Sequence, residues 1–136
     1  MKKILVLCTG NSCRSQMAEG YLRLFASDRA TVLSAGVEAH GLNPKAVETM
    51  AADGVDISKH QSKTVEDLKP QNVDFVITVC DNAKERCPYF PGSKQFHRDF
   101  PDPAKAVGSD EDIRRAFSAV RDEIKRYAKE FVQANL

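Results

Sequence analysis

The sequence predicts an α/β fold: one three-layer sandwich domain spanning residues 1–136, with helices on both faces of a four-stranded parallel sheet. The chain of 136 residues has the length of a single domain. Its 42% hydrophobic and 29% charged residues are typical of a globular protein. Strand-like apolar runs alternate with helical patterns, which favours a parallel sheet joined by right-handed crossovers.

Two pairs of a strand and a helix are predicted in the first half of the chain. Residues 4–7 form an aliphatic run typical of a strand buried on both faces. The helix that follows has an apolar stripe made of Met17, Ala18, Tyr21, Leu22 and Phe25. Residues 31–35 predict the second strand. The next helix begins after Asn43 as N-cap, with Pro44 as its first residue, and stops at Gly54.

The second half continues the pattern with weaker signals. Residues 58–71 are polar, with a short helical patch predicted around Val65 and Leu68. Residues 73–79 predict a third strand that leads into a cysteine. After a loop rich in proline, residues 95–96 belong to a weaker fourth strand.

The end of the chain combines an irregular segment with a long helix. Pro101 and Pro103 enclose Asp102, which excludes a regular helix or a central strand there. Ser109 begins the last helix, and its apolar residues recur at three- and four-residue steps. They are Ile113, Ala116, Phe117, Val120, Ile124, Tyr127 and Phe131. This stripe predicts core packing.

Charge and hydropathy exclude several classes of partner. The 20 Lys and Arg against 19 Asp and Glu leave a net charge of +1, so no basic surface for nucleic acid is implied. No apolar run approaches the roughly 18 residues of a membrane span, and none resembles a signal sequence. We expect a cytoplasmic monomer that binds neither nucleic acid nor membrane. In that compartment the four cysteines indicate thiol chemistry or a metal site ahead of structural disulfides.

The strongest motif is CTGNSCRS at residues 8–15. Cys8 ends the first strand, Arg14 follows six residues later, and a helix begins directly after. The small and polar residues around Gly10 allow successive amide groups to turn inward, and such a nest at a helix N-terminus binds tetrahedral oxyanions. Arg14 can add two parallel hydrogen bonds. The predicted oxyanion-binding loop consists of Thr9, Gly10, Asn11, Ser12, Cys13, Arg14 and Ser15.

The same positive field favours the thiolate form of Cys8, which makes it the candidate nucleophile. Ser15 can donate a hydrogen bond to its sulfur, and Asn11 can brace a left-handed turn. The alternative is a buried cysteine beside an unrelated arginine, which the spacing and loop composition disfavour. Cys8, Gly36 and Cys80 all fall at carboxyl ends of predicted strands, the edge where parallel sheets bind ligands.

The stretch CTGNSCRSQMAEG at residues 8–20 resembles low-molecular-weight protein tyrosine phosphatases and the arsenate reductases that share their fold. With the remaining motifs, the chain is most similar to the thioredoxin-coupled arsenate reductases. Those motifs are SAG at 34–36, HGLNP at 40–44, VDIS at 55–58, Cys80 with Cys87, Asp102 with Pro103, and VRDEI at 120–124. The resemblance therefore covers almost the whole chain.

This resemblance implies reduction of arsenate to arsenite, for which two thiols supply two electrons by forming a disulfide. It implies that Cys8 attacks arsenate while Asp102 protonates the leaving oxygen. Cys80 then forms a transient Cys8–Cys80 disulfide, and Cys87 converts it into a Cys80–Cys87 disulfide. Residues 81–86 must rearrange for these sulfurs to meet. No cofactor is expected to be bound, because thioredoxin supplies the reducing equivalents. A glutaredoxin-coupled route is the alternative, which the third thiol disfavours because the protein can present its own disulfide.

Some of these reductases hold a potassium ion beside the loop, and Asn11, Glu19 and Ser34 match residues that line that site. The carboxylate expected beside them is replaced by Lys63 here. We expect the Lys63 ammonium to take the place of the cation, bonding Glu19 and supporting the loop, with no metal bound. Three residues lack the spacing of a metal site and are expected to be structural or solvated: His40, His60 and His97.

Structural alternatives stay open for the other candidates. Cys13 has no step in this chemistry and is expected to pack within the loop or to be an oxidation-prone bystander. Cys80 could be a packed strand-end residue and Cys87 a surface thiol, whereas their spacing disfavours zinc. Asp102 could be a turn residue alone.

The predicted function is that of a thioredoxin-dependent arsenate reductase for arsenic detoxification, with slow phosphatase side activity. One alternative is a tyrosine phosphatase regulated by oxidation of its extra cysteines. Residues 104–106, Ala-Lys-Ala, replace the tyrosines that such phosphatases carry after Asp-Pro, which disfavours aromatic esters. A second alternative is a non-catalytic oxyanion or redox sensor, which the joint presence of nucleophile, arginine and candidate acid disfavours.

Overall fold

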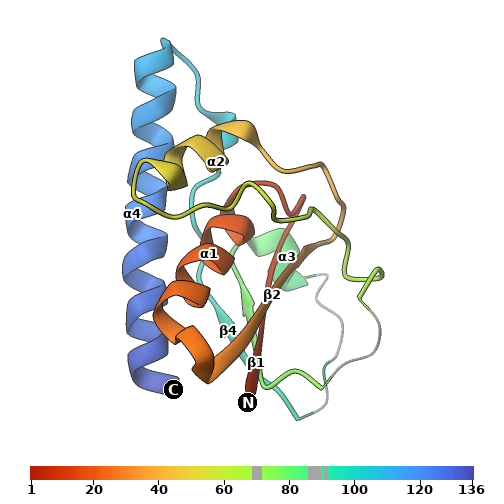
Figure 1. Ribbon diagram of the computed structural model, residues 1–136. Helices are drawn as coiled ribbons and strands as arrows, with labels where there is room; N and C mark the ends of the chain where they lie inside the picture. Colours follow the sequence, from red (N-terminus) through yellow and green to blue (C-terminus); the bar gives the residue numbers. More distant parts are fainter. Residues whose placement is uncertain (69–71, 86–89, 91) are drawn as a thin grey trace.

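A four-stranded parallel sheet forms the centre of the computed structural model, which describes residues 1–68, 72–85, 90 and 92–136 (Figure 1). The strands, in the order β2-β1-β3-β4, are β1 (Lys2–Cys8), β2 (Ala30–Gly36), β3 (Phe75–Thr78) and β4 (Lys94–His97). Leu7 of β1 pairs with Ala35 on one side and Thr78 on the other. The carboxyl ends of these three strands therefore meet at one edge, and the predicted fold is confirmed.

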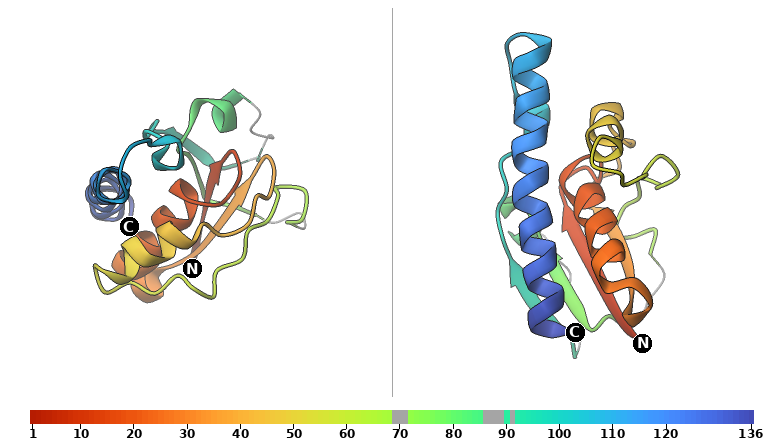
Figure 2. Two further views of the ribbon diagram at one scale, coloured as in Figure 1. Left: turned by 90° about the horizontal axis from the view of Figure 1, so that it is seen from above. Right: turned by 60° about the vertical axis from the view of Figure 1, so that its left-hand side comes forward.

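The helices lie on both faces of the sheet. They are α1 (Arg14–Ala26), α2 (Pro44–Ala51), α3 (Asp81–Glu85) and α4 (Asp110–Asn135), with 3-10 turns at Ser27–Arg29 and Pro103–Lys105. Helix α1 follows β1 toward β2, whereas α3 follows β3 in the opposite direction across the sheet, so right-handed crossovers place them on opposite faces. Helices α1 and α4 pack side by side, and α4 extends beyond the sheet (Figure 2). None of the helices described is long and apolar enough to cross a membrane.

The hydrophobic core lies between the sheet and the helices that cover it. The aliphatic residues of β1 are buried because helices cover both sides of this central strand. On α4, Phe131 packs edge-on against Phe75 at 5.5 Å and Phe96 at 5.0 Å between ring centroids. Each such pair contributes about 0.5–1.5 kcal/mol beyond its buried area. This aromatic cluster ties α4 to β3 and β4.

Helix ends are fixed by the capping residues predicted for them. The side chain of Asn43 accepts a hydrogen bond from the backbone of Lys45, and Pro44 is the first residue of α2. Ser109 and Asp112 form a reciprocal capping box at the start of α4. Such caps are each typically worth about 1 kcal/mol.

Two segments differ from the prediction. The helical patch around Val65 and Leu68 is wrong: Thr64 forms a parallel bridge with Gly36, and a turn follows. The backbone N–H of Val65 donates to Gly36 at 2.9 Å, so pairing with a strand end outweighs a weak apolar pattern. Helix α3 was not predicted because its five residues are mostly polar, although Ala83 is buried. The proline-rich loop predicted before β4 lies largely outside the described residues.

Candidate active site

The loop of residues 8–15 joins β1 to α1 at the carboxyl edge of the sheet. Asn11 has a φ of 48°, in the left-handed region, and is buried. Its amide nitrogen donates to Ser15 at 2.8 Å and to Ser34 at 3.0 Å. Its oxygen accepts from the backbone N–H of Lys63 at 2.9 Å. These bonds fix a conformation that Asn tolerates better than most residues, and they hold the loop in shape.

Cys8 is buried at the base of this loop, with its Sγ 2.8 Å from the hydroxyl of Ser15. The Asn11 amide nitrogen can only donate, so the Ser15 oxygen accepts from it and keeps its own hydrogen free. That hydrogen is then directed at the sulfur. The Cys8 sulfur therefore accepts a hydrogen bond from Ser15, below the loop that leads into the N-terminus of α1. The geometry is that of an activated nucleophile.

Cys8, Arg14 and Asp102 open into one cavity of about 280 Å³. One terminal nitrogen of Arg14 donates to the carbonyl of Phe100 at 3.1 Å, and the other lies 3.6 Å from the Asp102 carboxylate. Asp102 also accepts from the backbone of Ala104 at 3.0 Å, so it is both a turn residue and a pocket residue. The cavity is lined by Cys8, Thr9, Gly10, Ser12, Cys13, Arg14, His40, Asp102, Ala104 and Lys105. It combines a thiol, an arginine and a carboxyl group around an anion loop.

Cys80 lies two residues after the end of β3 and is buried, and its Sγ is 3.3 Å from the hydroxyl of Thr9. The side-chain amide of Asn82 donates to the same hydroxyl at 3.3 Å. The Thr9 hydrogen is therefore available to the Cys80 sulfur. A second thiol thus lies at the edge of the loop, in contact with Thr9, the residue that follows the nucleophile Cys8. Cys87 lies outside the described residues, so its predicted disulfide with Cys80 stays a prediction.

Cys13 is a third buried thiol and lines the same cavity. Burial raises its pKa from 9.0 to about 11, although a hydrogen bond with Ser12 opposes the shift. Cys13 is therefore protonated near neutral pH, where thiols react slowly. This state suits packing within the loop.

Behind the loop, Glu19 is buried on α1 and fully hydrogen-bonded. Its carboxylate accepts from the Ser34 hydroxyl at 2.6 Å and from the Nε of Arg23 at 2.9 Å. His60 lies 3.5 Å away, and burial lowers its pKa although Glu19 acts in the opposite direction. The ring of His60 also contacts Gln16 at 3.0 Å, which agrees with the structural role expected for it.

The role expected for the Lys63 ammonium is wrong. Its Nζ is 3.4 Å from the carbonyl of Gln61, and Arg23 is the cation that pairs with Glu19. Arg23 lies one helical turn from Glu19, so it reaches the carboxylate along α1. Lys63 supports the loop through its backbone N–H, which bonds Asn11, and not through its charge.

The oxygens that the resemblance assigns to a potassium ion already have protein donors. The Asn11 oxygen accepts from the Lys63 backbone. Both carboxylate oxygens of Glu19 are used, by Ser34 and Arg23. Each of these oxygens thus already accepts a hydrogen bond from the protein, and the absence of a bound potassium ion stays a prediction. In the part of the chain that the structure describes, no cluster of three His, Cys, Asp or Glu side chains could hold a metal.

Two residues contribute to the site in ways that the sequence did not specify: His40, and Gly36, which was predicted only to lie at the ligand-binding edge of the sheet. His40, expected to be structural or solvated, lines the cavity above Cys8. Gly36 ends β2, and a β-carbon there would lie 2.7 Å from the Asn11 nitrogen and 2.8 Å from the Thr9 oxygen. Only glycine allows the loop to approach β2 this closely. The signal in the sequence for His40 was its place in the HGLNP motif, and the signal for Gly36 was a glycine at the end of a predicted strand.

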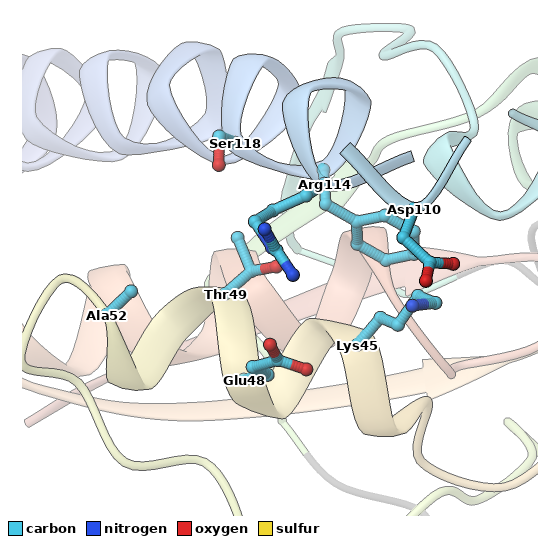
Figure 3. A pocket seen from close by; sticks show the side chains of 8 residues that line it. Lys45, Glu48, Thr49, Ala52, Asp110, Arg114 and Ser118 are labelled. Carbon is cyan, nitrogen blue, oxygen red and sulfur yellow. The ribbon is translucent and has the colours of Figure 1, made fainter. Parts of the chain in front are cut away.

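A second cavity of about 200 Å³ lies between α2 and α4 (Figure 3). The side chains of Lys45, Glu48, Asp110 and Arg114 surround it, and Thr49 lies near Arg114 (Figure 3). None of its lining residues is a cysteine or belongs to the anion loop. This cavity therefore offers no thiol nucleophile.

The site defines a class of protein in which a cysteine nucleophile lies under an oxyanion loop closed by an arginine. Residues 3–136 match the low molecular weight phosphotyrosine protein phosphatase family, and the chain belongs to that family. This confirms the resemblance drawn from the motifs.

The most informative relatives are named arsenate reductases. The chain is 48% identical over 133 residues to that of Halalkalibacterium halodurans, covering 97% of this chain and 96% of the relative. The arsenate reductase of Bacillus subtilis is 47% identical with the same coverage. A solved structure described as an arsenate reductase in the phosphate binding state has a TM-score of 0.86 at 28% identity, covering 98% of both chains.

Proposed function

We propose that this protein reduces arsenate to arsenite, with Cys8 as nucleophile and Cys80 as the second thiol. The observation that carries the proposal is the Cys80 thiol 3.3 Å from Thr9, beside the loop. Hydrolysis of a phosphate ester needs one thiol, whereas arsenate reduction needs two electrons, which two thiols supply by forming a disulfide. The names of the relatives at 48% and 47% identity support the same activity.

The first step forms a bond between sulfur and arsenic. The loop amides and Arg14 hold the arsenate oxygens above Cys8, in the cavity that Asp102 also lines. The Cys8 thiolate attacks arsenic, and one arsenic–oxygen bond breaks. The Asp102 carboxyl group gives its proton to the departing oxygen, which leaves as water. Arsenic remains pentavalent in the Cys8 adduct.

The second step transfers two electrons. The Cys80 sulfur attacks the Cys8 sulfur and loses its proton, which forms the Cys8–Cys80 disulfide and breaks the sulfur–arsenic bond. The bonding electron pair stays on arsenic, which becomes trivalent and leaves as arsenite. The hydroxyl of Thr9, 3.3 Å from the Cys80 sulfur, supports this step because it can hydrogen-bond to the attacking sulfur.

The third step regenerates the nucleophile. Cys87 attacks Cys80, so that a Cys80–Cys87 disulfide forms and Cys8 returns as a thiolate. The dithiol of thioredoxin then reduces this disulfide, supplying two electrons and two protons per cycle. Helix α3, of five residues, separates these cysteines, and a helix this short has little stability of its own to resist rearrangement.

The test is turnover with arsenate, thioredoxin, thioredoxin reductase and NADPH. The parent should oxidise NADPH, and Cys8→Ser, Cys80→Ser and Cys87→Ser should each abolish turnover. Cys13→Ser is the matched control and should retain it, because Cys13 has no step in the relay. Turnover that survives loss of Cys80 or Cys87 would overturn the three-thiol proposal.

A second candidate activity follows from membership of the phosphatase family. The same Cys8, Arg14 and Asp102 would hydrolyse a phosphate ester slowly without a second thiol. Hydrolysis of a small aryl phosphate should therefore survive Cys80→Ser and be lost in Cys8→Ser. A parent that hydrolyses the ester rapidly and leaves arsenate unreduced would make this the main activity.

A further inference from the structure

His40 is held against the anion loop by two contacts. Its backbone N–H donates to the carbonyl of Gly10 at 2.9 Å. Its ring is so close that a β-carbon at Gly10 would lie 2.8 Å from Cγ and closer still to Nδ1. The residue lines the same cavity as Cys8 and Arg14. Its imidazole therefore forms part of the wall that a bound anion meets.

The partner of the ring fixes which nitrogen carries the proton. Nε2 of His40 lies 2.8 Å from a carboxylate oxygen of Glu38. Because a carboxylate only accepts, Nε2 is the donor, and Nδ1 is the nitrogen near Gly10. Among the described residues, none hydrogen-bonds to Nδ1. When Nδ1 also gains a proton, the ring becomes a cation with a donor at the anion loop.

We propose that His40 binds the outer oxygens of the substrate oxyanion through Nδ1, as an imidazolium balanced by Glu38. This inference rests on the proposed function only for the identity of the anion, since phosphate has the same shape and charge as arsenate. It adds a binding residue at the cavity wall to the loop amides and Arg14. His40 would thereby favour multiply charged tetrahedral anions over singly charged ones.

The charges around the cavity explain why anion binding and protonation of His40 are coupled. Besides His40, the cavity is lined by two basic side chains, Arg14 and Lys105, and by one carboxylate, Asp102. A doubly charged anion adds negative charge beside Nδ1, so a proton on the ring is more favourable in the complex, where Glu38 at 2.8 Å from Nε2 balances the imidazolium charge. The protein should therefore take up protons when it binds phosphate. A ring that only packs on Gly10 would not produce this uptake.

The experiment is calorimetric titration of inorganic phosphate in two buffers that differ in ionisation enthalpy. All proteins carry Cys8→Ser, so that no thiolate at Cys8 contributes protons. His40→Phe keeps a ring on Gly10 without nitrogens, and Glu38→Gln removes the balancing charge. Asp102 is common to every protein compared, so differences in proton uptake between them report on the pair of His40 and Glu38. Thermal unfolding is recorded for each variant to exclude loss of fold.

The expected result is proton uptake in the Cys8→Ser background that falls sharply in His40→Phe and partly in Glu38→Gln. Phosphate affinity should fall about three- to tenfold in His40→Phe, a moderate loss for a charge-assisted bond on a half-exposed side chain. Unchanged affinity, or weaker affinity with unchanged proton uptake, would overturn the proposal. Absence of phosphate binding in the background itself would contradict the anion loop, and with it the proposed function as well.

Discussion

The sulfur of Cys80 lies 3.3 Å from the hydroxyl of Thr9, the residue that follows Cys8 in the loop. Strand β3 brings Cys80 to this position beside β1, because Leu7 and Thr78 are paired one and two residues before the two cysteines. The described parts of the structure thus place a second thiol at the rim of the anion loop. A phosphatase mechanism has no use for it, whereas the arsenate reduction proposed above uses it as the second thiol.

Thr9→Val should slow formation of the disulfide. The change keeps the shape of the side chain and removes the hydroxyl that contacts Cys80 and accepts from Asn82. Loss of one hydrogen bond to a thiolate corresponds to about tenfold in rate. Rapid-quench measurement of arsenite released in a single turnover checks this. Thr9→Ser keeps the hydroxyl and should stay near the parent rate; equal rates in Thr9→Val would contradict a role for the contact.

Gly36→Ala should disturb the loop from the neighbouring strand. The new methyl group would lie 2.7 Å from the backbone nitrogen of Asn11, so the loop must shift. We expect about 1–3 kcal/mol of lost stability from overpacking, together with weaker phosphate binding. Gly54→Ala is the control, because Gly54 has a φ of 81° and no neighbouring atoms within 4 Å. It should lose about 1 kcal/mol from backbone strain and keep its phosphate affinity. Urea unfolding and phosphate titration distinguish the two.

Arg23→Met should destabilise the fold through Glu19. The substitution removes the 2.9 Å bond to a buried carboxylate and a 2.7 Å bond to the carbonyl of Val32. Because Arg23 is about half exposed, water compensates in part, and the expected loss is about 1–3 kcal/mol in urea unfolding. Arg23→Lys retains the charge and should lose less. A urea midpoint of Arg23→Met equal to that of the parent would contradict this, because it would show that water replaces Arg23 at the Glu19 carboxylate.

The buried Cys13 thiol should make stability fall at alkaline pH. The unfolded chain releases the Cys13 proton near pH 9, whereas the folded chain holds it until about pH 11. Between these values the unfolded state binds fewer protons, so the free energy of unfolding decreases as pH rises. Burial also raises the pKa of Tyr21, which adds to the slope in any variant that keeps it. Cys13→Ala should show a shallower decrease in urea unfolding across this range, and an identical slope would contradict the shift.

Local patterns in the sequence were sufficient for the fold and for the centre of the site. The aliphatic run before Cys8, the small loop residues and Arg14 lie within a short stretch, where backbone geometry follows from nearby residues. Asn43 with Pro44 marks a helix start for the same reason. These features depend on chain neighbours, so spacing alone located them.

Features that depend on tertiary contacts were not accessible in this way. The spacing of Glu19 and Arg23 on α1 was a local signal for their ion pair, whereas the distance of Lys63 from Glu19 was not, because the Lys63 ammonium lies against the carbonyl of Gln61. His40 joins the site because its backbone bonds Gly10, a contact that no local pattern specifies. Helix α3 is too short to form on its own and depends on its packing against β1 and β3.

The most direct test of the account is a single turnover of the Cys87→Ser variant with arsenate and no reductant. Because the relay must stop after its second step, each chain should release one arsenite. Mass spectrometry of the unreduced protein should then find Cys8 joined to Cys80. Release of arsenite without this disulfide, or a disulfide between Cys8 and Cys13, would contradict the central role assigned to Cys80.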